Sequence, residues 1–131
     1  MGRVIGFEIS GQDPKGHSAF YANVFGWDIG EPNWGYYPAK TGDVGQAGID
    51  GGIAKGPAHF PVGVRLQIQV DSIHESIAKA AEHGGRVVQD VMDFDGFRLA
   101  YIIDPMGVHY GLIEYRSNAN NQGGRTIDED R

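Results

Sequence analysis

Apolar and polar residues alternate in two separate stretches of the chain, 4–10 and 62–70, a spacing typical of strands with one buried face. In the first stretch Glu8 alternates with the apolar residues and so lies on the other face of the expected strand. In the second stretch the same holds for Arg65 and Gln67. The apolar set of the second stretch is Val64, Leu66, Ile68 and Val70. We therefore expect Glu8, Arg65 and Gln67 to point away from the helices that cover these strands.

Each of these stretches is followed by a helical pattern. Asp13-Pro14 is typical of a helix start, because the carboxylate caps the helix and proline suits its first position. Gly26 is placed to end this helix. Residues at helical spacing between these points, which we expect to form a buried apolar stripe, are His17, Phe20, Tyr21, Val24 and Phe25. Ser72 and Glu75 form a capping box that predicts a second helix.

Shorter strand patterns follow each helix, at 27–29, 36–39 and 46–54 after the first and at 86–93, 97–103 and 108–115 after the second. The order strand, helix and three strands therefore occurs twice. We predict an α+β fold in a single domain, residues 1–116, built from paired βαβββ modules at about 3–54 and 62–115. The polar segment 117–131 has too little apolar surface to order itself and is expected to be a disordered tail.

Composition narrows the function classes. The chain has 131 residues, a net charge of −6 and no cysteine. The 11 lysines and arginines are scattered, which argues against a nucleic-acid surface. The absence of cysteine excludes disulfides and a thiolate nucleophile, and no apolar run approaches the roughly 20 residues of a membrane span. We expect a soluble cytoplasmic protein without nucleic-acid or membrane partners.

Two segments carry a family resemblance. One is Phe20-Tyr21-Ala22-Asn23-Val24-Phe25-Gly26-Trp27, and the other is the turn Asp104-Pro105-Met106-Gly107 between two strand patterns. Together they resemble the vicinal oxygen chelate superfamily, the fold of glyoxalase I, bleomycin-resistance proteins and the extradiol dioxygenases such as dihydroxybiphenyl dioxygenase. The resemblance implies that the modules curl into a partly open barrel that holds a ligand, completed within one chain or by exchange between two.

Enzymes of that superfamily hold a divalent metal, and the resemblance places its ligand positions on Gly6, Gly51 or Gly52, Arg65 and Gly111. None of these residues binds a cation, and Arg65 would place a permanent positive charge at the site. The five histidines show no ligand spacing that rebuilds it. We therefore expect neither a metal nor another cofactor.

The polar residues whose side chains are expected to point away from the helices form a candidate ligand site. The glycines around them would enlarge such a pocket. These residues are Glu8, Arg65, Gln67, Tyr101 and His109. Four of them have a plainer interpretation as well: a structural salt bridge for Glu8 and Arg65, a solvated side chain for Gln67, and a hydrogen-bonded structural histidine for His109. Tyr101 is the weaker member of the set, because the alternation along its strand does not fix the face on which it lies. Three further aromatic residues either form a stacking wall for a ligand or serve packing and dimer contacts, and packing is the favoured interpretation: Trp34, Tyr36 and Tyr37.

Three functions remain open at this stage. The first is a metal-independent protein that binds a small polar organic molecule, acting as a homodimer. The second is a metal-independent lyase, isomerase or hydrolase in which Glu8 or His109 is the base and Arg65 steadies an oxyanion. The third is a structural module whose cleft is vestigial.

Overall fold

The computed structural model describes residues 2–116, which fall into two compact units. The N-terminal unit is Val4–Ile68. The C-terminal unit begins at Gln69 and also takes in the first residues of the chain. The predicted tail, 117–131, lies outside the described residues.

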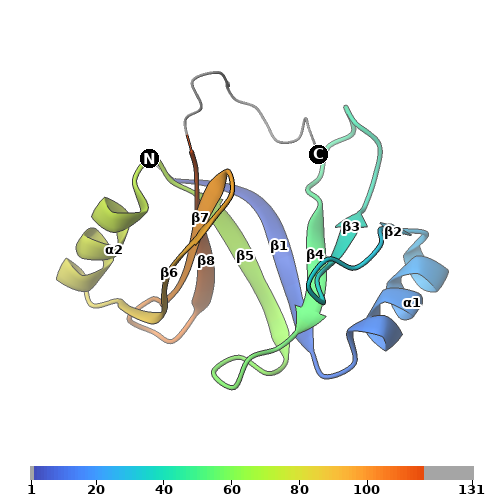
Figure 1. Ribbon diagram of the computed structural model, residues 1–131, viewed down its shortest axis with the longest axis horizontal. Coiled ribbons are helices and arrows are strands. Elements are labelled where there is room, and N and C mark those ends of the chain that lie inside the picture. Colours follow the sequence, from blue (N-terminus) through green and yellow to red (C-terminus); the bar gives the residue numbers. More distant parts are fainter. Residues whose placement is uncertain (1, 117–131) are drawn as a thin grey trace. The chain divides into compact units, whose positions relative to one another are not determined.

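The N-terminal unit has a single helix against a sheet of five strands in its described residues (Figure 1). Its elements are β1 (Arg3–Gly11), α1 (Pro14–Phe25), β2 (Asp28–Ile29), β3 (Tyr37–Lys40), β4 (Gly51–Lys55) and β5 (Gly63–Gln69). The strand order is β2-β3-β4-β1-β5, with β1 parallel to β4 and β3 antiparallel to both β2 and β4. The strand predicted at 46–54 begins only at Gly51.

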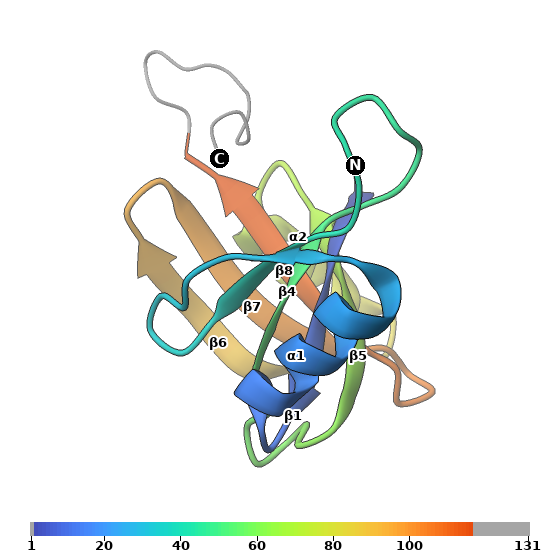
Figure 2. The same cartoon turned by 90° about the vertical axis from the view of Figure 1, so that its right-hand side faces the viewer.

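The register of this sheet separates an apolar face from a polar one. Ile9 pairs with Ile53, and both belong to a buried core against which Tyr21 of α1 packs. Glu8 pairs with Gly52, one residue earlier on each strand. Because successive side chains of a strand point to opposite faces, Glu8 faces away from α1. Figure 2 shows α1 lying over the apolar face of this unit.

Both ends of α1 form as predicted. The Asp13 carboxylate accepts a hydrogen bond of 3.1 Å from the Gly16 amide, and Gly26 adopts the left-handed conformation with φ 73°. The predicted burial of the apolar stripe is wrong for three of its members. Phe20 and Val24 are each 55% exposed and Phe25 is 60% exposed. The helix spacing was read correctly, but these side chains are only partly covered, by ring contacts of Phe20 and Phe25 with Tyr21 at centroid distances of 5.2 and 6.2 Å.

The apolar parity of β5 also departs from the prediction. Val64 is 61% exposed and Leu66 is 38% exposed, whereas Arg65 between them is buried. Val70 at the end of this stretch is buried, as predicted, and Gln69 is exposed, so the departure is confined to the first part of β5. There, Arg65 and Gln67 donate hydrogen bonds to Glu8.

The C-terminal unit contains α2 (Ile73–Glu82), β6 (Arg86–Phe94), β7 (Phe97–Ile103) and β8 (His109–Tyr115). The three strands are antiparallel in the order β8-β7-β6, and α2 lies against them (Figure 1). The Ser72 hydroxyl accepts a hydrogen bond from the Glu75 amide at 3.2 Å, as the capping box predicts. In the turn before β8, the Asp104 carboxylate accepts hydrogen bonds of 2.9 Å from two backbone amides.

The α+β class and the repeated order of strand, helix and three strands are thus confirmed. In the part of the chain that the structure describes, neither helix is long and apolar enough to cross a membrane.

A network of charges joins the strands of the C-terminal unit to α2. Asp93 on β6 accepts hydrogen bonds from Arg98 at 2.8 Å and from Arg116 at 3.0 Å. Arg98 also contacts the Glu114 carboxylate at 3.2 Å, and the second oxygen of that carboxylate accepts the Ile73 amide at 2.8 Å. Glu114 therefore lies on the face of β8 that carries α2.

Asp93 should give this unit a pH-dependent stability. The hydrogen bond from Arg98 is the main cause that holds the pKa of the Asp93 carboxyl below its ordinary value of 3.8. A lowered pKa in the folded state stabilises the fold above the unfolded value, and this contribution is lost as the pH falls through the folded value. We expect urea unfolding to show a stability difference between wild type and Asp93→Asn at neutral pH that disappears in acid. Asp95→Asn, in the neighbouring turn, is the control, and a difference that persists unchanged in acid would contradict the assignment.

Candidate functional site

The polar face of the N-terminal unit carries a cluster of three side chains from two strands. Glu8 comes from β1, and Arg65 and Gln67 come from β5. Arg65 Nη2 lies 3.3 Å from Glu8 Oε1, and Gln67 Nε2 donates to Glu8 Oε2 at 3.0 Å. The side chain of Arg65 is 4% exposed and that of Glu8 is 12% exposed. The sequence therefore predicted these three neighbours correctly, and the ion pair is nearly buried.

An aromatic ring covers the guanidinium of this cluster. The carbon at the centre of the Arg65 guanidinium lies 4.7 Å from the centroid of the Phe60 ring, a cation–π distance. Phe60 belongs to the connection between β4 and β5, which Gln12 holds through a 2.9 Å hydrogen bond to the Pro61 carbonyl. Sequence reasoning missed Phe60, because it lies in a loop rich in proline and glycine where no periodicity marks a partner.

Two glycines beside the cluster make room for neighbouring groups. A Cβ added at Gly52 would lie 2.0 Å from the ring of Tyr36, so that ring lies directly over the backbone of β4. A Cβ added at Gly6 would lie 3.0 Å from the Asp50 carbonyl and 3.5 Å from the Gln67 amide oxygen. The expectation that these glycines enlarge a pocket is wrong, because other parts of the unit occupy the space above them.

The aromatic residues before β3 divide in their roles. Tyr37 packs against the buried core, as expected, and Tyr36 lies over Gly52. Trp34 is 99% exposed, so the packing interpretation is wrong for it. Trp34 and Gly35 both have positive φ, 57° and 80°, in a tight turn that the backbone amides close. The turn directs Trp34 into solvent.

The other two predicted site residues lie in the C-terminal unit. In the pairing of β7 with β8, Tyr101 is opposite Gly111 and Ile103 is opposite His109. Tyr101, Gly111 and His109 therefore share one face, and the alternation along β8 places it opposite to the face of Glu114 and α2. Tyr101 is buried and His109 is half-buried. Both predicted residues thus occupy the helix-free face of their own unit.

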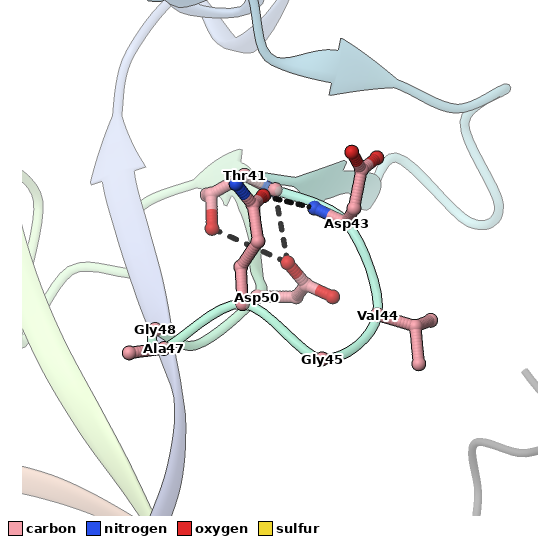
Figure 3. Close-up of a pocket in the computed structure, with 9 residues that line it drawn as sticks. Thr41, Asp43, Val44, Gly45, Ala47, Gly48 and Asp50 are labelled. Atoms are coloured by element: carbon pink, nitrogen blue, oxygen red, sulfur yellow. Dashed lines mark hydrogen bonds between the residues drawn. The ribbon is translucent and has the colours of Figure 1, made fainter.

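A cavity of about 450 Å³ lies within the loop that connects β3 to β4 (Figure 3). Its walls belong to the loop itself, from Thr41 to Asp50. The Asp50 carboxylate accepts the Thr41 amide at 2.8 Å, and the Gln46 side chain accepts the Asp43 amide at 2.7 Å. Because these groups hold the loop in its own shape, we place the candidate site on the Glu8 face and not here.

The donors on the polar face do not suit a divalent metal. Glu8 supplies a carboxylate, but the Arg65 guanidinium lies within 3.3 Å of it and already balances its charge. The remaining positions implied by the family resemblance are glycines, which offer no side-chain donor. Within residues 2–116 no group of three or more His, Cys, Asp or Glu is arranged to hold a metal ion.

Removing one partner of the buried ion pair should cost stability. Glu8→Gln leaves the Arg65 charge buried without its counter-charge, and we expect a loss of roughly 3 kcal/mol in the free energy of unfolding. Replacing both partners with apolar residues of similar size, Glu8→Leu with Arg65→Met, should recover most of that loss. Chemical denaturation measures both, with Asp93→Asn as an exposed ion-pair control. A Glu8→Gln protein as stable as wild type would refute the burial of this pair.

The contact of Tyr36 with Gly52 should appear as a coupling energy between substitutions at the two positions, measured in the free energy of unfolding. Gly52→Ala places a methyl group where the ring lies, and we expect a loss of about 1–3 kcal/mol. In a Tyr36→Ser background the same change should cost at least about 1 kcal/mol less, because the ring is gone. Denaturation of the four proteins of this cycle gives the coupling energy, and additive effects would show that the ring does not cover β4.

A family model described as glyoxalase-like domain matches residues 7–113. No match is found among curated proteins. Solved structures with a similar fold include a hypothetical protein from Bacillus halodurans C-125, at 19% identity and a TM-score of 0.61, covering 92% of this chain and 99% of that one. A variant of Streptomyces coelicolor methylmalonyl-CoA epimerase in complex with 2-nitronate-propionyl-CoA has 19% identity and a TM-score of 0.61 over 86% and 94% of the two chains.

A glyoxalase/bleomycin resistance protein/dioxygenase superfamily member from Vibrio splendidus 12B01 has 14% identity and a TM-score of 0.61, over 88% of this chain and 100% of that one. At these identities the structures share the fold alone. The family model, in contrast, spans most of the described residues. The chain therefore belongs to the glyoxalase-like domain family.

Proposed function

We propose that the protein binds a small polar organic molecule without a metal, through Glu8, Arg65 and Gln67 on the helix-free face of the N-terminal unit. The observation that carries the proposal is the nearly buried ion pair between Glu8 and Arg65, joined by the Gln67 amide. Replacing such a pair with apolar residues often leaves a protein equally stable, so stability alone does not explain its presence. Contact with a polar ligand accounts for a charged pair at this position.

The groups around the pair offer a ligand several kinds of contact. Gln67 supplies an amide that both donates and accepts, and Tyr36 and Phe60 supply aromatic surface on either side. A small number of fixed polar groups beside aromatic walls is typical of sites for small organic molecules. The methylmalonyl-CoA epimerase whose fold is similar holds a CoA thioester, which makes acyl-CoA compounds a first class to test.

Tyr101 and His109 are part of the same proposal as ligand contacts on the helix-free face of the C-terminal unit. Their shared orientation beside Gly111 supports this role. Catalysis by Glu8 is the less favoured alternative. A general base needs an oxygen that reaches a substrate proton, and each oxygen of Glu8 already accepts a hydrogen bond from a protein side chain.

Two matched glutamines provide the test. Gln67 contacts Glu8, whereas Gln69, two residues further along, is exposed. We expect isothermal titration of wild type with a panel of propionyl-CoA, short dicarboxylates and amino acids to yield at least one ligand. The Kd of that ligand should rise roughly tenfold in Gln67→Met, a loss of about 1.4 kcal/mol in binding free energy. In Gln69→Met the Kd should stay unchanged.

The same titration in the presence of EDTA distinguishes the metal-free proposal from a metal-dependent one. Binding that EDTA leaves intact supports it, because no bound cation is then required. Binding that EDTA abolishes, or equal affinity in wild type and Gln67→Met, would contradict the proposed site. The failure of every compound in the panel to bind would count against small-molecule binding itself.

A further inference from the structure

A single residue of β6, Gln89, stands between two irregularities in the pairing of that strand. Val87 pairs with Ile102 of β7. The register then shifts between Val87 and Gln89, and it shifts again between Gln89 and Met92. Between the two shifts Gln89 pairs with Tyr101, a residue of the helix-free face. An extra residue in a strand re-aims the side chain that follows it, and such bulges are frequent beside active sites.

The first shift decides which face of the sheet receives the Gln89 amide. Without it, the pairing would continue evenly and place Gln89 opposite Ala100. Ala100 is buried and lies on the face that carries α2, because Arg98 on the same parity contacts Glu114 there. With the shift, Gln89 lies on the face of Tyr101 and is half-buried. The irregular strand thus brings a polar side chain to the helix-free face.

Protection of the sheet edge is the other use of such irregularities. β6 is the outermost of the three strands of this unit (Figure 2). Bulges hinder the pairing of an outer strand with another chain. That protection depends on the backbone and requires no particular side chain between the bulges. It therefore does not explain an amide at the one position that is aimed toward Tyr101.

The polar groups around Gln89 offer a ligand hydrogen bonds but no negative charge. Pairing of the three strands places four polar residues at one end of the helix-free face: Arg86, Gln89, Tyr101 and His109. Amide, phenol and imidazole groups donate as well as accept hydrogen bonds, and a guanidinium only donates. The carboxylates that pair within these strands, Asp93 and Glu114, both lie on the α2 face. This end of the face therefore favours a carbonyl or carboxylate group.

The same face becomes apolar one row further along the strands. Met92 pairs with Leu99 in the row next to Gln89, and both are half-buried. Beyond them the rings of Phe94 and Phe97 stack with centroids 5.0 Å apart, and Phe94 is 42% exposed. A polar row followed by apolar rows is complementary to a molecule with a hydrogen-bonding head and an apolar chain.

We propose that Gln89 is a ligand-binding residue, whose amide holds the head group of a small monocarboxylic acid while the alkyl chain lies toward Met92 and Leu99. This inference rests on the proposed function, because it adds a residue and a ligand class to the contacts proposed at Tyr101 and His109. A dicarboxylate suits the face less, since its second charge would lie on the apolar rows. An amine suits it less because the charged side chain at the polar end is a guanidinium.

Hexanoate, hexanamide and hexylamine are matched probes, because they share one chain and differ in the head group. In NMR titrations of the nitrogen-labelled full chain, we expect hexanoate to bind most tightly and to shift the side-chain amide signal of Gln89. The loss of that signal in Gln89→Met assigns it. The Kd of hexanoate should rise roughly tenfold in Gln89→Met, as expected for a lost hydrogen bond to a charged group. It should stay unchanged in Gln69→Met, which alters an exposed glutamine.

A second substitution separates direct contact from an effect on the strand. The carboxylate of Gln89→Glu repels a carboxylate head but not the neutral hexanamide, so the Kd of hexanoate should rise roughly tenfold more than that of hexanamide. Gln69→Glu adds the same charge at an exposed position and should change neither Kd. Equal losses for both probes would show that Gln89 acts only through the fold, and tighter binding of hexylamine would overturn the ligand class.

The outcomes for this inference and for the proposed function are separable. A ligand of the earlier panel that is weakened by Gln67→Met but not by Gln89→Met would retain the proposed function and overturn this inference. Weakening of hexanoate by Gln89→Met and not by Gln67→Met would support this inference and overturn the site on the N-terminal unit. Failure of all three probes to bind would overturn the inference.

Discussion

The buried ion pair between Glu8 and Arg65 constrains the N-terminal unit more than any other interaction. A guanidinium that is 4% exposed must keep its counter-charge, because an isolated buried charge is strongly destabilising. The pair therefore links β1 to β5, because a slip of β5 by one residue would turn Arg65 to the face opposite Glu8. Phe60 lies over Arg65, and Gln67 lies beside Gly6.

The same pair sets the charge of the polar face, where the Arg65 guanidinium lies 3.3 Å from the Glu8 carboxylate. A divalent metal needs several neutral or anionic donors, whereas this face carries one carboxylate that a guanidinium already balances. The positive charge on this face thus comes from a side chain of the chain itself. A guanidinium donates hydrogen bonds in a fixed plane and cannot accept electron pairs from two vicinal oxygens as a metal does. Such a face offers hydrogen-bond donors and acceptors at fixed positions to a polar molecule.

Features marked by residue type or by a regular period were predictable from the sequence, and features that depend on irregular loops or on which face is covered were not. The caps at Asp13 and Ser72 form between residues three apart, so their residue types were sufficient to predict them. The parity that joins Glu8 to Arg65 was likewise readable from alternation. The cover of Phe60 over Arg65 was not, because it depends on the path of an irregular loop. The exposure of Val64 was missed for a related reason, since alternation gives the period of a strand and not which of its faces is covered.

The two helices differ in their outer surfaces although they hold equivalent places in the fold. Both begin with a side-chain cap and both cover a sheet, so the repeated module explains their place but not their outer surfaces. In the C-terminal unit, Glu114 accepts the first amide of α2 and also contacts Arg98, while charged residues face the solvent. In the N-terminal unit, α1 exposes more than half of Phe20, Val24 and Phe25. The repeated module therefore fixes the place of each helix on its sheet, whereas the residue types on the outer side are set separately in each copy: Glu75, Lys79 and Glu82 on α2, and Phe20 and Val24 on α1.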